Sequence, residues 1–466
     1  MSLSVAYNIA RSSLQATQSQ IGVVSRNTSS ATDPAYSRKI ASLVTQGGVA
    51  RVIVTRASSV ALYTKMIETT SDASQKAALL DGLEKLNQTI GDTDLNESPA
   101  AYVGKLKTAL QNYAKSPDSS ATARAFVESA NDMATSLNRA SLKVQAIRQE
   151  ADRDIADSVN LINDILVKFE AANNAVMRGV AVGADVSDSL DTRDALVAQL
   201  SEELGINVVE RAGGDMAIYT DSGVPLFERE ARTVTFDRTL TYSPGTVGNA
   251  IFIDGVQVTG PGAPMPLNSG KLVGLAELRD KVTVSYQDQI HALSAALVDA
   301  FAQPPGSVFE TDPTAPGRIR VNPMIDPSYT DPLTGEVGSY DRIRDGAGYP
   351  SDDAADSDNL FRLVREMERD DRAFDPALGL GAMASLQEFA SSSASWVQAN
   401  RQQTSDQFEY QKTLLGQASD LLSNATDVNM DDETALMLQL EKSYSASAKL
   451  IAMIDELFKT LLNMVD

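Results

Sequence analysis

The clearest pattern in the chain is an apolar stripe at each end, spaced for an α-helix. Near the start, apolar or small residues recur at alternating intervals of four and three over residues 3–28, and the same spacing runs over residues 437–465. This is the a/d heptad pattern of a helix that packs along a partner helix. At 1.5 Å per residue the stripes extend about 39 and about 43 Å. We therefore predict two long terminal helices of matching length.

These stripes supply most of the residues that we expect to form an assembly interface. They are Leu3, Tyr7, Ala10, Leu14, Ile21 and Val24 near the start, and Leu440, Tyr444, Ile451, Ile454, Phe458 and Leu461 near the end. Small or polar members such as Ala10, Thr17 and Ser447 make a weak seam for an isolated coiled coil. Such seams are typical of helices that a neighbouring subunit completes in a polymer. Two amphipathic helices within one globular core are the alternative interpretation.

Between the ends, the pattern predicts long helices interrupted by a strand-rich region. Helical periodicity covers about 60–95, 99–115, 120–178, 190–204, 271–302, 359–371 and 380–425. Ser98-Pro99 supplies a cap and a first helical residue, and Gly205 is expected at a helix C-cap. From Ile206 the period changes to two, and Asp254-Gly255 predicts a hairpin with a type I′ turn.

The predicted fold class is mainly α with a β-rich insert (α+β). We expect a long, multidomain, coiled helical rod built from paired N- and C-terminal helices. The expected domains are 1–60 with 426–466 as a terminal assembly domain, 61–205 with 271–302 and 376–425 as a helical rod, 206–270 as a β-rich unit, and 303–375 as a loop- and strand-rich outer insert. The length of 466 residues fits about three domains.

Composition excludes several classes of function. The net charge of −22 disfavours a nucleic-acid partner. The sequence has no run of 18 apolar residues, so we expect no membrane insertion. The chain has no cysteine and a single histidine, His291, which argues against thiolate or His-rich metal sites and a Ser-His-Asp triad. We expect neither a cofactor nor enzymatic activity.

Charge is distributed unevenly along the chain. Residues 1–60 hold six cations and one acid, whereas residues 427–466 hold eight acids and three lysines. The two stripes therefore match in length and oppose each other in charge. An arginine-rich start with few acids is also typical of an organellar transit peptide, which is a second interpretation of this region.

Two clusters of carboxylates are candidates for chemistry. Asp191 and Asp194 lie near the start of a predicted helix, where anions complement the helix dipole. Four aspartates in a loop are candidate calcium ligands, although the spacing lacks the glycine of an EF-hand. They are Asp352, Asp353, Asp356 and Asp358. A solvated acidic loop is the simpler interpretation.

Residues 25–39 resemble the signature of the rod–hook–filament axial proteins, roughly S-x-N-I-A-N-x-N-T-P-G-Y-S-R-Q. Asn27, Pro34, Tyr36, Ser37 and Arg38 match this pattern. Thr28 stands in place of isoleucine and Ala35 in place of glycine. The matching residues Asn27, Pro34 and Tyr36 complete the expected assembly interface.

Further segments resemble the flagellar hook-associated protein 1 family. Residues 188–196 resemble its D-x-L-D-x-R-D-x-L helix, and 268–275 its G-x-L-x-G-L segment. Residues 319–323 are similar to its I-x-V-N-P strand, and 428–433 and 444–449 to its V-N-L-D-E-E and Y-Q-A-S-A-R elements. Order and spacing hold from end to end.

This resemblance implies a structural component of the bacterial flagellum at the hook–filament junction. The implied partners are a ring of its own subunits, the hook protein, a second hook-associated protein and a dedicated export chaperone at residues 427–466. The implied location is extracellular, after export through the flagellar type III apparatus. Two alternatives remain: another axial protein, such as hook protein or flagellin, and a secreted hydrolase or adhesin whose working part is 206–375. The helix at 188–196 argues against the first.

Overall fold

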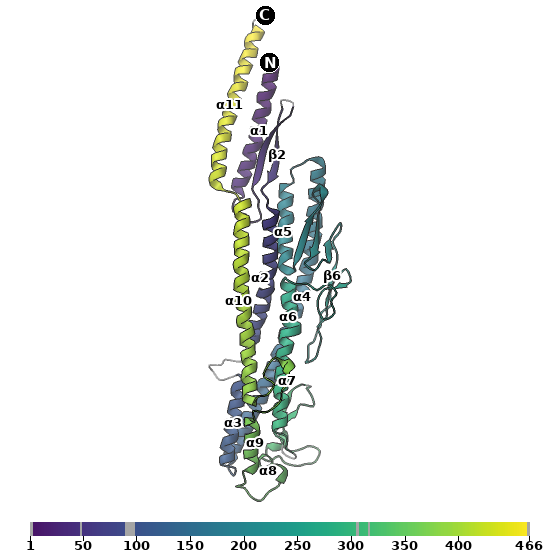
Figure 1. Ribbon diagram of the computed structural model, residues 1–466, viewed down its shortest axis with the longest axis vertical. Coiled ribbons are helices and arrows are strands. Elements are labelled where there is room, and N and C mark those ends of the chain that lie inside the picture. Colours follow the sequence, from purple (N-terminus) through teal and green to yellow (C-terminus); the bar gives the residue numbers. More distant parts are fainter. Residues whose placement is uncertain (1–2, 47–48, 89–97, 304–306, 316, 464–466) are drawn as a thin grey trace.

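The computed structural model describes residues 3–46, 49–88, 98–303, 307–315 and 317–463 as an elongated helical rod (Figure 1). Both ends of the chain lie at one tip of the rod. The short helices α8 (Asp341–Asp345) and α9 (Asp358–Glu368) lie at the opposite tip. The architecture is mainly helical with small antiparallel sheets, as the predicted fold class requires.

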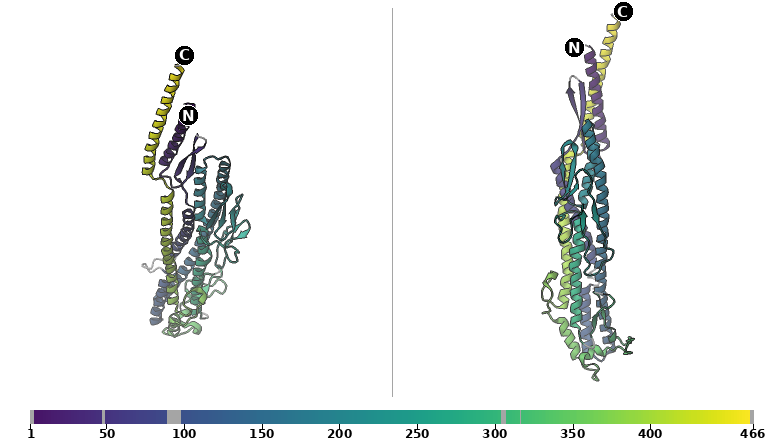
Figure 2. Two further views of the ribbon diagram at one scale, coloured as in Figure 1. Left: turned by 45° about the horizontal axis from the view of Figure 1, so that its top comes forward. Right: turned by 90° about the vertical axis from the view of Figure 1, so that its right-hand side faces the viewer.

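The tip that holds both chain ends consists of two helices and a hairpin, here called the terminal unit. They are α1 (Leu3–Ser29), α11 (Met430–Asn463), β1 (Lys39–Gln46) and β2 (Val49–Arg56). Helix α1 runs antiparallel to α11 and packs between it and the hairpin (Figures 1 and 2). The sequence analysis missed this hairpin, although Gly47-Gly48 separates two runs rich in β-branched residues, which is a hairpin signal.

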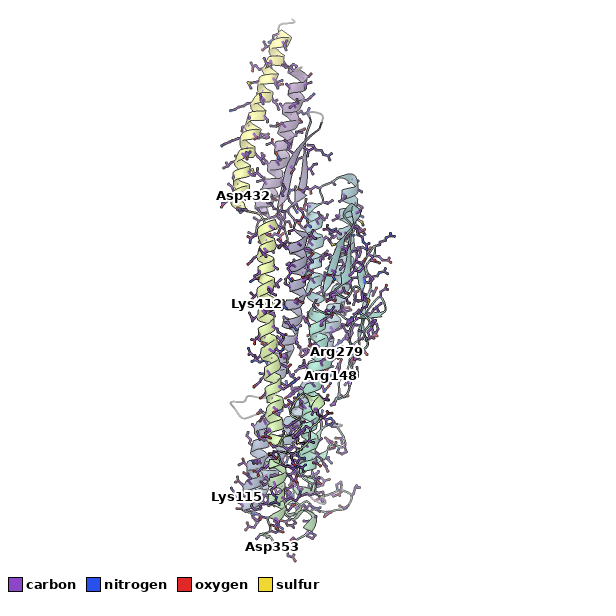
Figure 3. All side chains as sticks on the ribbon, in the orientation of Figure 1. Lys115, Arg148, Arg279, Asp353, Lys412 and Asp432 are labelled. Atoms are coloured by element: carbon purple, nitrogen blue, oxygen red, sulfur yellow. The ribbon has the colours of Figure 1, made fainter. Side chains whose placement is uncertain are left out.

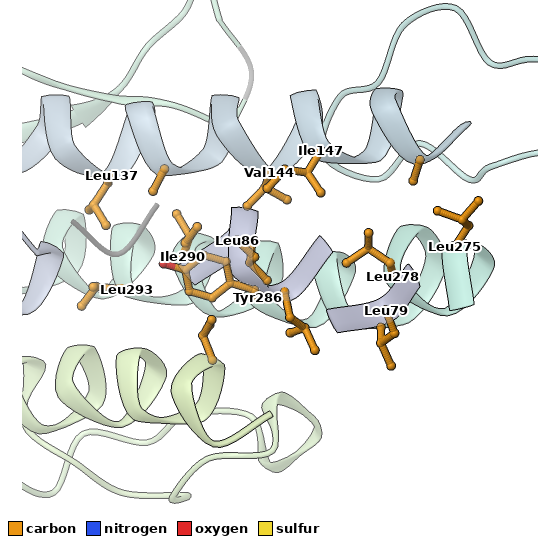
Figure 4. Packing of buried hydrophobic residues seen from close by; sticks show 14 of the residues in the cluster. Leu79, Leu86, Leu137, Val144, Ile147, Leu275, Leu278, Tyr286, Ile290 and Leu293 are labelled. Atoms are coloured by element: carbon orange, nitrogen blue, oxygen red, sulfur yellow. The ribbon is translucent and has the colours of Figure 1, made fainter. Parts of the chain in front are cut away.

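Seven helices of the described residues build the rod. They are α2 (Val60–Asn87), α3 (Pro99–Lys115), α4 (Ser120–Val182), α5 (Ser187–Glu203), α6 (Lys271–Glu277), α7 (Thr283–Ala300) and α10 (Leu386–Thr426). Helix α4 has 63 residues and is therefore about 95 Å long. Helix α10 packs along α2, while α3, α5 and α7 pack along α4. Figure 4 shows leucine, isoleucine and valine side chains of these helices meeting in one continuous core.

Local capping chemistry determines where several of these helices begin. The Ser98 side chain accepts a hydrogen bond from the Ala101 N–H, and Pro99 occupies the first turn, as predicted. Ser385 and Glu388 form a reciprocal capping box at the start of α10. The predicted helix over 60–95 is helical to Asn87, and residues 89–97 lie outside the described residues.

A π-helical turn, Leu278–Val282, interrupts the helix predicted over 271–302. The Arg279 carbonyl in this turn accepts hydrogen bonds from Arg148 Nε at 3.0 Å and from the Thr283 hydroxyl at 2.9 Å. The Arg279 side chain, 1% exposed, pairs with Asp152 at 2.7 Å. Asp152 also accepts from the Thr239 N–H and the Tyr242 hydroxyl, both at 2.8 Å. This buried network, near the labelled Arg148 and Arg279 in Figure 3, fastens the loop before β7 to the rod.

Two three-stranded sheets lie along one side of the rod (Figure 1). Their strands are β3 (Ile206–Glu210), β4 (Met216–Thr220), β5 (Pro225–Phe227), β6 (Val234–Phe236), β7 (Ile251–Ile253) and β8 (Val256–Gln257). The predicted Asp254-Gly255 turn is present, and both residues have positive φ, 48° and 81°. Phe227 packs edge-on against Phe169 of α4, with ring centroids 4.9 Å apart. These contacts bury one side of the sheets against the rod.

The strand-rich segment leaves and rejoins the rod at one point. The Gly205 N–H donates to the Ser269 carbonyl at 3.0 Å, and the Gly270 N–H to the Ser71 carbonyl of α2 at 3.0 Å. Gly205 does not have the left-handed cap conformation that its expected role implies, and the C-cap residue is the extended Leu204. A Cβ on Gly205 would lie 2.3 Å from the Ser269 hydroxyl, so close approach is the physical reason for glycine here.

The remaining described strands are β9 (Phe309–Thr311) and β10 (Ile319–Val321), which pair with each other. Asn138 of α4 binds the backbone of Ile319 through both its amide nitrogen and its amide oxygen. Helix α9 packs on α3. The expected division of the chain into four domains stays a prediction.

Candidate assembly site at the paired chain ends

Helices α1 and α11 pack along each other, and several predicted heptad positions are buried. Ala10, Val24, Leu440 and Ile454 are buried at the positions that the stripes specify. Most other stripe positions are half-buried, namely Leu3, Tyr7, Leu14, Ile21, Ile451 and Phe458. Tyr444 and Leu461 remain exposed, as does Pro34 in the following loop. The stripes therefore mediate contact within the chain, and their contact with a neighbouring subunit stays a prediction.

A second apolar stripe on α11 has no partner among the described residues. Leu450, Met453 and Leu457 are 49%, 56% and 52% exposed. At 100° per residue they lie about 100° around the helix from the seam with α1. The sequence analysis missed them, although their spacing of three and four is the same signal that located the first stripe. On α1, Val5 and Ile9 are also exposed.

Asn27 is the centre of a buried polar cluster at the base of the terminal unit. It is 1% exposed, and its amide nitrogen donates to the Lys39 carbonyl at 2.9 Å and to Glu433 at 3.0 Å. Its amide oxygen accepts from the Tyr36 hydroxyl at 2.8 Å and from the Lys39 N–H at 2.9 Å. The motif residues Asn27 and Tyr36 thus join α1, the hairpin and α11.

Glu433 completes this cluster from the first turn of α11, next to the labelled Asp432 in Figure 3. Its carboxylate is 1% exposed and pairs with Arg38 Nε at 2.7 Å. The Arg38 N–H donates to the Thr426 carbonyl at the end of α10 at 2.8 Å. These bonds hold the bend between α10 and α11 against the loop that follows α1.

Ion pairs connect the hairpin to α5 of the rod. Lys39, whose side chain is fully buried, bonds to Asp191. Arg56 bridges Asp191 at 3.2 Å and Asp194 at 2.5 Å. The sequence analysis attributed these aspartates to the helix dipole, whereas the structure pairs them with cations of the hairpin. The pairing could not be found by local spacing, because Lys39 and Asp191 are 152 residues apart.

Burial perturbs the ionisation of this site. It raises the pKa of Tyr36 to about 12, although Arg26 acts in the opposite direction. Burial also raises the pKa of Asp194 from its ordinary value, against the effect of Arg56. For Arg56, burial acts to lower the pKa, but Asp194 and Asp191 together outweigh it and the pKa is raised. The cluster therefore favours neutral Tyr36 and charged Arg56.

Two of the four loop aspartates that are candidate calcium ligands bind the backbone of their own loop. Asp353 accepts from the Ala355 N–H at 3.0 Å and Asp356 from the Asp358 N–H at 2.9 Å, so these carboxylates brace their own loop. Within the described ranges, no group of three or more acidic or histidine side chains is arranged to hold a metal ion. Nor does that part of the chain contain a helix long and apolar enough to span a membrane.

Comparisons with known proteins agree with this architecture. Residues 66–305 match the family described as flagellar hook-associated protein FlgK helical domain, and residues 404–464 match the flagellar basal body rod FlgEFG protein C-terminal family. The chain is 22% identical over 316 residues to flagellar hook-associated protein 1 of Escherichia coli, covering 63% of this chain and 56% of that protein. It is 23% identical over 242 residues to the protein of the same name from Salmonella typhimurium, covering 49% and 42%.

A search of solved structures matches the chain to the flagellar hook junction protein FlgK from Burkholderia pseudomallei. It is 20% identical, with a TM-score of 0.43, over 53% of this chain and 47% of the other. The matches span about half the length of the curated relatives. Because the helical-domain match covers more than half of this chain, the chain belongs to the family of the flagellar hook-associated protein FlgK.

Proposed function

We propose that this chain is a structural, non-enzymatic component that joins the hook to the filament of the bacterial flagellum. The match of residues 66–305 to the FlgK helical domain carries this proposal. The relatives are named as hook-associated proteins, and a junction role for this chain extends that description to it. The paired terminal helices supply a physical means of assembly.

The same match favours the junction over another axial component. The C-terminal match, residues 404–464, is to a family named after rod and hook proteins, and it does not by itself distinguish the junction from them. The helical-domain match is to the hook-associated family alone, and it includes the helix with Asp191 and Asp194. The junction is therefore the better assignment.

The proposed partners are those that the family resemblance implies, and the exposed apolar residues of the terminal unit are consistent with them. Subunits of the same chain would pack through α1 and α11 in a ring, between the hook protein below and a second hook-associated protein above. Before export, a dedicated chaperone would cover residues 427–466, since Leu450, Met453 and Leu457 form an exposed apolar stripe that favours aggregation. The proposed location is outside the cell, after export by the flagellar type III apparatus.

Deletion of the gene in its host tests the proposal. We expect cells with hooks but without filaments, with flagellin released into the medium, and restoration of filaments by the full chain supplied on a plasmid. Electron microscopy of the cells and immunoblots of the medium measure both effects. Normal filaments on the deletion strain would refute the junction role.

A further inference from the structure

A cavity opens where the terminal unit joins the rod. Its volume is about 810 Å³, and it lies between the loop that precedes β1, the start of α2, α5 and the end of α10. Apolar side chains form part of the lining, including Met66, Ala198 and Leu422. The cavity is large enough to receive side chains from another molecule.

The cavity is lined by acidic residues, and most of their carboxylates have no ion-pair partner among the described residues. Glu202, Glu210, Asp420 and Asp427 line it, and none of them forms an ion pair among the described residues. Asp194 also lines it, and the Oδ1 atom of Asp194 is buried without a hydrogen-bond partner. The lining cation Arg56 is already engaged by Asp191 and Asp194. A cationic side chain with an apolar stem suits this lining.

The β1–β2 hairpin presents such a side chain. Arg51 lies opposite Val44 in the hairpin register, and Ile53 lies opposite Ser42 on the same outer face. Val44 and Ile53 are 43% and 46% exposed, and Arg51 is exposed with no ion-pair partner in the described part of the chain. Among the described residues, a cation without an ion pair thus lies beside exposed apolar side chains on the outer face of the hairpin.

We propose that the outer face of the hairpin of one copy docks on this cavity in a second copy, with Arg51 entering the acidic lining. The inference rests on the proposed structural function and names the contact between subunits. Charge complementarity supports it, since Arg51 has no ion pair among the described residues and would meet carboxylates of the rod that also lack one there. The two surfaces differ, so the contact is heterologous, and repeated contacts of this kind build a ring or a helix rather than a closed dimer.

Cysteine crosslinking tests the contact in assembled flagella, because the chain has no cysteine of its own. The variant Val44→Cys/Ser423→Cys, made in the deletion strain, places one thiol on the hairpin and one at the cavity. After treatment of isolated flagella with a short thiol crosslinker, we expect a ladder of dimers, trimers and longer products. The matched control, Val44→Cys/Leu333→Cys, carries its second thiol at a site that is 94% exposed and lies outside both surfaces, and should give no ladder.

The outcomes separate this inference from the proposed function. Protein that is present in isolated flagella but forms no ladder overturns the docking inference and leaves the junction role intact. Protein that is absent from isolated flagella, although it is made and secreted, overturns both. A ladder that also appears with the control pair would show nonspecific proximity and would equally overturn the inference.

Charge reversal supplies a second test. Arg51→Glu should reduce the number of filaments per cell about tenfold, because it places an anion against unpaired carboxylates. Arg51→Glu combined with Asp420→Arg should restore most of them. Arg11→Glu is the matched control, since Arg11 is an exposed cation of α1 without an ion-pair partner among the described residues. Equal defects for Arg11→Glu and Arg51→Glu, or none for Arg51→Glu, would contradict the proposal.

Discussion

Replacing Asn27 by alanine should release the terminal unit from the rod. The substitution removes four hydrogen bonds that the Asn27 amide forms with Lys39, Tyr36 and Glu433. The two Lys39 backbone groups would be left unpaired in a buried site, at about 1 kcal/mol each. The lost bond to the Glu433 carboxylate costs a further 1.5–3 kcal/mol or so, while the half-buried Tyr36 hydroxyl can turn towards water. The sum is about 4 kcal/mol.

Hydrogen exchange measured by mass spectrometry on the full chain provides the assay. The free energy of opening for peptides of α1 and the β1–β2 hairpin should fall by about 4 kcal/mol, or to zero if the terminal unit is less stable than this. Peptides of α4 should not change, because the cluster lies at the base of the terminal unit and α4 packs in the rod.

Asn131→Ala is the matched control for Asn27→Ala. The Asn131 side chain is exposed and bonds to the Val127 carbonyl of its own helix, so its loss should cost under about 0.5 kcal/mol. A decrease below about 1 kcal/mol in α1 for Asn27→Ala would refute the reasoning. An equal decrease in α4 would show that the cluster stabilises the whole rod instead.

Three further predictions concern the rod and the ionisation of the cluster. Gly274→Ala should destabilise the chain by about 1–3 kcal/mol in urea unfolding, because its Cβ would lie 2.3 Å from the Gln75 carbonyl oxygen, whereas Gly416→Ala, with open space, should stabilise it by up to about 1 kcal/mol. Asp152→Asn should cost about 1.5–3 kcal/mol in the same assay, since the buried Arg279 loses its bond to the Asp152 carboxylate and keeps only its pair with Asp280. The pKa of Tyr36, raised to about 12 from 10.0, predicts a stability contribution that is full below pH 10.0 and is lost as pH rises towards 12. Tyr36→Phe should flatten the fall in melting temperature over that range, and an unchanged fall would contradict the assignment.

Sequence periodicity predicted the long helices, because each of them carries an apolar stripe along one face. The stripes that contain Ala10 and Leu440 predicted α1 and α11, because heptad spacing is a local property that survives without knowledge of the partner. The π turn at Leu278–Val282 was not predictable in this way, since it depends on the burial of Arg279 against Asp152 of another helix.

The candidate site could be predicted only in part, because it also depends on contacts between residues that are far apart in the sequence. Asn27 and Tyr36 were found through a motif, but their joint role appears only when Glu433, 406 residues away from Asn27, is brought beside them. No role was predicted for Lys39, and its burial against Asp191 follows from the hairpin that was not predicted. The two strands of that hairpin have eight residues each, but their apolar and polar positions do not alternate strictly, so the period-two signal is weak.

The hydrogen bond between Gly205 and Ser269, where the strand-rich segment leaves and rejoins the rod, matters for protein engineering. The segment between them begins and ends at hydrogen-bonded neighbours on the rod, so its two ends lie close together. A short linker needs only to span that gap, so the segment can be exchanged for a foreign domain whose own ends lie close together. The rod beneath would lose the bonds of Thr239 and Tyr242 to Asp152, which a compensating apolar pair in place of Asp152 and Arg279 could replace. Such a chimera would display its cargo along the side of the molecule, remote from both chain ends.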